Sequence, residues 1–115
     1  MKKIMIVDDS EVHTLILKFM LEGMELELVT FRSPNGIEEL LDQEQPDLLI
    51  MDIRLDSANG CQICTSLKTN ANYSALPILL TSSNRDYYEE DCLANGFIAK
   101  PYSKNGLLEQ ISNFV

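Results

Sequence analysis

The sequence contains no apolar run long enough to cross a bilayer, because a transmembrane helix needs about 20 consecutive apolar residues. The N-terminus is basic and then apolar, as in a signal peptide. However, the apolar run stops at Asp8 and Asp9, and no small-residue cleavage site follows. These absences favour a cytoplasmic protein that does not bind membranes.

Basic residues are scarce. The chain has 9 Lys and Arg against 18 Asp and Glu, which gives a net charge of −9. Contacts with nucleic-acid phosphates need clustered Lys and Arg, and the sequence contains no such cluster. Direct binding of nucleic acid is therefore not expected.

The apolar content is sufficient for one core. Hydrophobic residues make up 45% of 115 residues, which is normal for a globular domain. No internal repeat, linker or low-complexity stretch divides the chain. We therefore expect one domain over residues 1–115.

Short apolar segments alternate with helical patterns. The segments 3–7, 26–31, 48–51, 78–81 and 97–99 have the character of strands buried on both faces. Parallel strands need crossover connections, usually helices. The alternation predicts a doubly wound α/β fold. We expect a five-stranded parallel sheet of order 2-1-3-4-5 in a flavodoxin-like three-layer sandwich.

Helices are expected after each of the five strands. Ser33 and Pro34 are suited to cap and open the second helix, and a fourth is expected around residues 87–94. The apolar positions of the other helices are Val12, Leu15, Ile16, Phe19 and Met20 on one face of the first, Ile37, Leu40 and Leu41 in the second, Ile63, Cys64 and Leu67 in the third, and Leu107, Leu108, Ile111 and Phe114 in the last.

Chemically active side chains follow four of these strands. Asp8 and Asp9 follow the first, Asp52 the third, Ser82 the fourth and Lys100 the fifth. Sites in such sheets form beyond the carboxyl ends of the strands. Three carboxylates brought together there need a cation, and all-oxygen ligands fit Mg²⁺. A carboxylate beside such an ion can attack phosphorus, with an amine and a hydroxyl to neutralise the phosphoryl oxygens. Each residue alone has an ordinary structural explanation, such as a helix cap, and it is the combination that favours a phosphoryl-transfer site.

Four segments carry a resemblance to a known family: residues 6–10 (IVDDS), 47–52 (DLLIMD), 76–83 (LPILLTSS) and 96–102 (GFIAKPY). Along nearly its whole length the sequence resembles the receiver domain of two-component response regulators, of the chemotaxis-regulator type. The resemblance implies a regulatory domain that takes a phosphoryl group from a histidine kinase or phosphotransfer protein. It also implies that the domain then acts on a downstream protein partner or output domain.

The resemblance also implies individual roles. Asp52 would be the phosphoacceptor, and Mg²⁺ would be held by Asp9, Asp52, the backbone carbonyl of Arg54 and, partly through water, Asp8. Lys100 would contact the phosphoryl group, and its peptide bond to Pro101 would be cis. Catalysis would be limited to the domain's own phosphorylation and dephosphorylation.

The resemblance implies a switch as well. Counting from Pro77, the switch hydroxyl falls on Ser82 rather than Thr81, and Phe97 takes the position of the responding aromatic residue. The family usually has proline where Asp56 stands, and the stretch from Ser82 to Lys100 is shorter than usual. A shortened or partly unwound fourth helix is therefore expected.

The cysteines suggest an alternative. Their odd number, three, does not indicate a disulfide framework, but Cys61 and Cys64 form a CxxC pattern at an expected helix start. That pattern would suit a flavodoxin-like binding or redox domain. We favour packing, because Cys64 lies on the expected buried face and a flavin phosphate loop is missing after the first strand.

Overall fold

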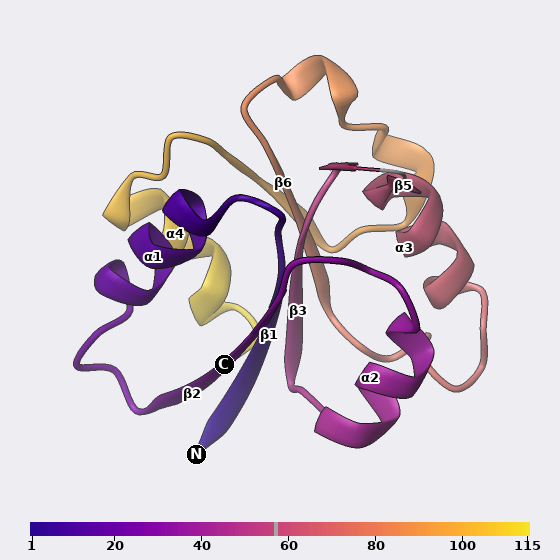
Figure 1. The fold of residues 1–115 in the computed structure, drawn as a ribbon, viewed down its shortest axis with the longest axis horizontal. Helices are drawn as coiled ribbons and strands as arrows, with labels where there is room; N and C mark the ends of the chain where they lie inside the picture. The colour runs from indigo at the N-terminus through magenta and orange to yellow at the C-terminus, as the bar shows by residue number, and fades with distance from the viewer. Residues whose placement is uncertain (57) are drawn as a thin grey trace.

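The computed structural model describes residues 1–56 and 58–115, and its centre is a five-stranded parallel sheet (Figure 1). In spatial order the strands are β2 (Leu26–Phe31), β1 (Lys2–Val7), β3 (Leu48–Asp52), β6 (Ile78–Ser82) and β7 (Gly96–Ala99). Counted along the chain, this is the order 2-1-3-4-5. The predicted doubly wound sheet is confirmed, and its strands begin and end within one residue of the expected positions.

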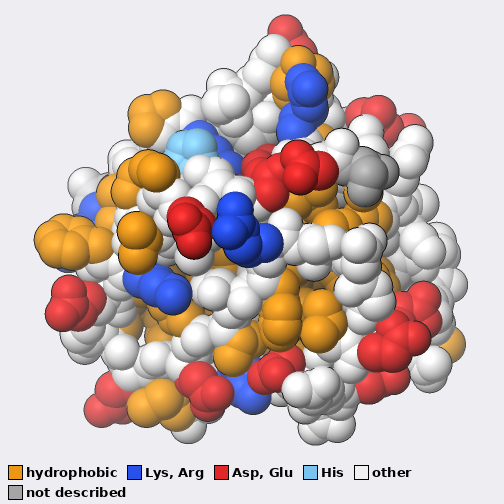
Figure 2. All heavy atoms as spheres, in the orientation of Figure 1, with side chains coloured by type: hydrophobic (Ala, Val, Ile, Leu, Met, Phe, Trp, Pro, Cys, Tyr) orange, Lys and Arg blue, Asp and Glu red, His pale blue; other side chains and the backbone are white. Residues whose placement is uncertain are grey.

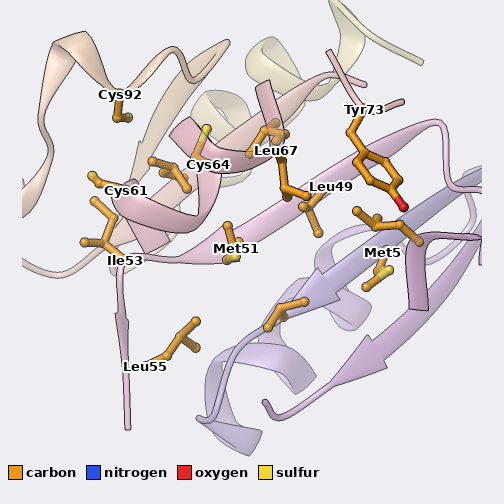
Figure 3. Packing of buried hydrophobic residues seen from close by; sticks show 14 residues of the cluster. Met5, Leu49, Met51, Ile53, Leu55, Cys61, Cys64, Leu67, Tyr73 and Cys92 are labelled. Carbon is orange, nitrogen blue, oxygen red and sulfur yellow. The ribbon is translucent and has the colours of Figure 1, made fainter. Parts of the chain in front are cut away.

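Helices cover both faces of the sheet. Helices α1 (Glu11–Met20) and α4 (Lys104–Ser112) pack on one face, and α2 (Ile37–Glu44) and α3 (Gly60–Lys68) pack on the other (Figure 1). Every residue of β3 and β6 is buried, as expected for uninterrupted apolar strands. Figure 3 shows the core on the α2 and α3 side, where Leu49 and Met51 of β3 meet Leu67 of α3. Within the described residues, no helix has the length and apolar character that a membrane span requires.

Helix α1 presents an apolar stripe to the outside. Of the positions expected to share one helix face, Val12, Leu15 and Phe19 are 65%, 62% and 77% exposed. Leu17, and Leu21 just beyond the helix, are buried against the sheet, and Ile16 and Met20 of the expected face also pack, partly buried, against the same cluster. The 3.6-residue spacing does not say which of two apolar faces meets the sheet.

Helix α2 begins later than predicted. Its N-cap is Gly36, in the left-handed conformation at φ 67°, so Ser33 and Pro34 do not open the helix. Ser33 Oγ instead accepts a hydrogen bond from the Asn35 amide at 3.1 Å. The serine therefore closes a local turn, which is the alternative use of a capping side chain.

The prediction of an α-helix around residues 87–94 is wrong. The connection between β6 and β7 contains two single turns of 3₁₀ helix, η1 (Arg85–Tyr87) and η2 (Glu90–Cys92). Tyr88 and Glu89 between them are extended, and Leu93 after η2 is left-handed at φ 72°. The fourth helix is therefore not only shortened, as predicted, but absent as an α-helix. The extended backbone at Tyr88 and Glu89 separates the two 3₁₀ turns.

The segment after β3, predicted as a polar loop over residues 54–60, contains a short hairpin. Strand β4 (Arg54–Leu55) pairs antiparallel with β5 (Ala58–Asn59), and residue 57 of the predicted loop lies outside the described residues. Asn59 caps α3 by accepting a hydrogen bond from the Cys61 amide at 2.8 Å. A Cβ on Gly60 would lie 2.9 Å from Cα of Ile53, so glycine lets α3 start directly against the end of β3.

Candidate functional site

The parallel register brings the predicted residues to one edge of the sheet. Asp52 is the last residue of β3 and Ser82 the last of β6, while Asp8 and Lys100 follow β1 and β7 directly. The Lys100 amide donates to the Ser82 carbonyl at 2.9 Å, which ties the last strand to its neighbour at that edge. All four residues are buried. Asp and Lys side chains are rarely buried unless they are paired, so Asp8, Asp52 and Lys100 are expected to have partners.

Lys100 supplies the cation for two of the carboxylates. Its ammonium Nζ lies 2.8 Å from Asp8 Oδ2 and 3.1 Å from Asp52 Oδ2, and the lysine side chain is only 4% exposed. Asp8 also accepts a hydrogen bond on Oδ1 from the Ser10 amide at 2.9 Å, and Asp52 accepts one on Oδ1 from the Arg54 amide at 3.3 Å. The two carboxylates are therefore held by fixed donors on both oxygens.

A third carboxylate completes an all-oxygen cluster. One oxygen each from Asp8, Asp9 and Asp52 lies within 4.8 Å of the others, with Asp9 half-buried. Oxygen ligands from carboxylates are those that Mg²⁺ prefers, so the residues present fit the metal suggested by the sequence. The part assigned to the Arg54 carbonyl is not tested by these distances and stays a prediction.

Burial raises the pKa of Asp52. Removal from water is the largest cause, and the nearby Asp8 charge adds to it, while the Lys100 ammonium and the Arg54 amide act in the opposite direction. The surroundings of Asp52 therefore disfavour its ionised form, and the Lys100 ammonium offsets part of that effect.

Both candidate switch hydroxyls are buried at the end of β6. Thr81 is 1% exposed and Ser82 2% exposed. Ser82 Oγ accepts a hydrogen bond from the Asn84 amide at 3.0 Å, so it is linked to the start of the β6–β7 connection. Phe97 in β7 is half-buried, and its ring stacks on Tyr88 with centroids 5.0 Å apart.

One contact near the site was not predicted from the sequence. Arg54, two residues after Asp52, donates from Nη1 to the Tyr87 hydroxyl at 2.6 Å, and its guanidinium carbon lies 4.7 Å from the centre of that ring. The two residues are 33 positions apart, and Tyr87 belongs to η1, where an α-helix was expected. By contrast, the cis peptide bond between Lys100 and Pro101, implied by the resemblance, is present.

The cysteines lie in the core, and the redox alternative is not favoured. Cys61, Cys64 and Cys92 are free buried thiols in the cluster shown in Figure 3. Burial raises the pKa of Cys61 to about 11 and that of Cys64 to about 12. Redox-active cysteines have a lowered thiol pKa, which is the opposite direction.

Comparison with known proteins identifies the family. The sequence model for the response regulator receiver domain matches residues 4–112. The chain belongs to this family. It is therefore a receiver domain of two-component response regulators, and as such a regulatory domain rather than a conventional enzyme.

Individual relatives agree with this assignment. The polar-differentiation response regulator DivK of Brucella anthropi is 28% identical over 120 aligned positions, which cover 99% of this chain and 96% of that protein. The chemotaxis protein CheY4 of Vibrio cholerae has the same fold, with a TM-score of 0.85, 19% identity and coverage of 100% and 99% of the two chains. The receiver domain of the sensor histidine kinase PA1611 of Pseudomonas aeruginosa matches with a TM-score of 0.82 and 20% identity over 98% and 96% of the chains, and its structure holds a magnesium ion in the active-site cleft.

Proposed function

We propose that residues 1–115 act as one receiver domain that accepts a phosphoryl group on Asp52 and changes its surface in response. The observation that carries the proposal is the buried bridge of Lys100 between Asp8 and Asp52, at 2.8 and 3.1 Å. A structural ion pair needs only one carboxylate. A lysine that is shared by two carboxylates and lies beside a third instead suits a site that binds a highly charged group such as a phosphoryl group.

The reaction follows from these positions. An oxygen of Asp52 forms a bond to phosphorus, the bond from phosphorus to the donor breaks, and the donor atom takes the electron pair. Lys100 neutralises charge on the transferred group, and the hydroxyl of Ser82 can donate to one of its oxygens. Asp8, Asp9, Asp52 and the Arg54 carbonyl would hold Mg²⁺, which when bound neutralises further negative charge. Attack of water on the same phosphorus reverses the modification.

The proposed phosphoryl donor is a histidine kinase or phosphotransfer protein. The proposed downstream target is a protein partner or an output domain. The exposed stripe of Val12, Leu15 and Phe19 supports a protein donor, because α1 begins two residues after Asp9 and so borders the site. Figure 2 shows hydrophobic side chains over α1, at the left of the molecule. The cytoplasmic location and the absence of nucleic-acid and membrane partners stay predictions.

The direct test is incubation with acetyl phosphate, with and without Mg²⁺, followed by intact-mass measurement. We expect the mass of one phosphoryl group to be gained only with Mg²⁺ and to be lost on treatment with hydroxylamine, which cleaves acyl phosphates. A protein that stays unmodified under these conditions would contradict the proposed function.

Replacing Asp9 with alanine tests the metal site. We expect Mg²⁺ affinity to fall on the order of tenfold or more, since even losing a side chain that only orients a ligand costs about tenfold. The metal-free protein should melt at a higher temperature, because one of three crowded carboxylates is gone. Titration calorimetry and thermal melting measure the two effects.

Asp56→Ala is the matched control, since it removes an exposed carboxylate from the neighbouring hairpin. It should change neither quantity. Unchanged Mg²⁺ affinity in Asp9→Ala would remove Asp9 from the ligand set.

Replacing Ser82 with alanine tests the switch. We expect phosphorylation to remain but the rearrangement around Phe97 to be lost, because the Asn84 amide then loses the Ser82 hydroxyl that links it to the site. NMR spectra with the phosphoryl mimic beryllofluoride would show the Phe97 signals shifting in the wild type and not in the variant. Thr81→Ala is the control, and a loss of the response in that variant alone would place the switch on Thr81.

A further inference from the structure

The contact between Arg54 and Tyr87 joins the phosphoacceptor loop to the β6–β7 connection. Arg54 follows Asp52 by two residues, and Tyr87 closes η1. The guanidinium both donates to the Tyr87 hydroxyl at 2.6 Å and lies over its ring at 4.7 Å. Among the described residues, Arg54 forms no ion pair with a carboxylate. The arginine two residues after the phosphoacceptor is therefore bonded to a tyrosine hydroxyl and not to a carboxylate.

Two of the three carboxylates at the site, Asp8 and Asp52, already have partners. Lys100 holds Asp8 and Asp52, and the Arg54 amide donates to Asp52 Oδ1. A guanidinium turned toward the site would find these carboxylate oxygens partly engaged. A phosphoryl group on Asp52 alters this balance, because it adds about 1.5 to 2 negative charges and three strong acceptor oxygens. Hydrogen bonds from arginine to such an anion are roughly twice as strong as those between neutral groups.

We propose that Arg54 exchanges the Tyr87 hydroxyl for the phosphoryl group on Asp52, and that this exchange releases η1. The inference rests on the proposed function. Arg54 binds the modified group directly, whereas Tyr87 is a positioning residue that holds the guanidinium away from it in the unmodified domain. The phosphorylated state is then reported by the segment that replaces the fourth helix.

The released segment is built to respond. Residue Tyr88, next to Tyr87, stacks on Phe97, and the guanidinium carbon of Arg85 lies 5.9 and 5.4 Å from the centres of these two rings. Single 3₁₀ turns contain few hydrogen bonds, so their movement costs less than shifting an α-helix. Freeing Tyr87 therefore reaches the same aromatic group that the Ser82 switch would move.

Tyr87→Phe tests the exchange, because it removes the hydroxyl and keeps the ring. With Arg54 held less firmly, apparent affinity for beryllofluoride in the presence of Mg²⁺ should rise roughly two- to tenfold, the equivalent of one hydrogen bond. In the Arg54→Gln background the same substitution should have no effect, since Tyr87 acts only through that guanidinium. Tyr88→Phe, which removes a neighbouring hydroxyl, is the matched control and should match wild type.

NMR adds a readout that a purely structural role would not move. On adding beryllofluoride to the wild type, the Arg54 Nε–Hε and Tyr87 ring signals should shift together. Wild-type affinity in Tyr87→Phe, or an equal change in the Arg54→Gln background, would overturn the exchange while leaving phosphorylation of Asp52 intact. Failure of the wild type to gain a phosphoryl group would overturn the proposed function, and this inference with it.

Discussion

Asp52→Asn should remove phosphoryl uptake from acetyl phosphate completely while the fold persists. The side chain keeps its shape and its contact with the Arg54 amide, but an amide oxygen does not form an acyl phosphate. Intact mass measures uptake, and circular dichroism measures the fold. A variant that still gained a hydroxylamine-sensitive phosphoryl group at the wild-type rate would show that Asp52 is not the acceptor.

The same variant should be more stable than wild type at neutral pH without metal. The pKa of Asp52 is raised above its ordinary value of 3.8 in the folded state, mainly by burial. Between the unfolded and folded pKa values, the native state therefore binds more protons, and the free energy of unfolding falls as pH rises. Asparagine lacks this dependence, so its stability gain should be full above that window and vanish below it.

Denaturant unfolding at several pH values, without Mg²⁺, measures this difference. Asp56→Asn serves as the control, since Asp56 is exposed. Parallel stability profiles for Asp52→Asn and wild type would mean that burial does not disfavour the ionised carboxylate.

The sheet and the position of the site at its edge could be predicted, because the apolar strand segments are compatible with only one kind of arrangement. An uninterrupted apolar run such as residues 48–51 fits a strand buried on both faces, and parallel pairing then places the carboxyl ends of all the strands at the same edge. For that reason the sequence alone predicts that Asp8, Asp52 and Lys100 lie close together. Their distances, and the sharing of one ammonium by two carboxylates, come only from packing.

The errors have a common physical origin, a choice between two locally acceptable arrangements. Ser33 can cap a helix or close a turn with Asn35, and it closes the turn. Helix α1 has two apolar faces, and contact with the sheet selects the one with Leu17. Residues 87–94 contain helix-compatible residues, but the stacking of Tyr88 on Phe97 accompanies an extended backbone there. Tertiary contacts override local propensity in the second and third cases, whereas the Ser33 turn is a local alternative within the same segment.

Lys100→Met should lower the free energy of unfolding of the metal-free protein by about 3 to 5 kcal/mol at neutral pH, the usual result of removing one partner from a buried ion pair. Methionine preserves the apolar length of the side chain. Two buried carboxylates, on Asp8 and Asp52, then lose the ammonium that lies 2.8 and 3.1 Å away. Domains of this size are stable by only about 5 to 15 kcal/mol, so the loss is a large share of the total.

Two further variants isolate the electrostatic cause. Lys104→Met removes an exposed lysine from the start of α4 and should leave stability nearly unchanged. Adding Asp8→Asn to Lys100→Met should recover part of the loss, because one of the two stranded carboxylates becomes neutral. If the single variant does not fold, this double variant still allows the measurement.

The pH dependence of the stability difference between wild type and Lys100→Met tests whether the charge of Lys100 is the cause. Without Lys100, the pKa of Asp52 should rise further, because the ammonium acts to lower it. The difference in stability between wild type and Lys100→Met should therefore shrink as pH falls and Asp52 gains a proton. Mg²⁺ should raise the melting temperature of Lys100→Met more than that of wild type, since a cation then has more unpaired charge to neutralise. A penalty that is independent of both pH and Mg²⁺ would show that Lys100 supports the fold through its packing rather than its charge.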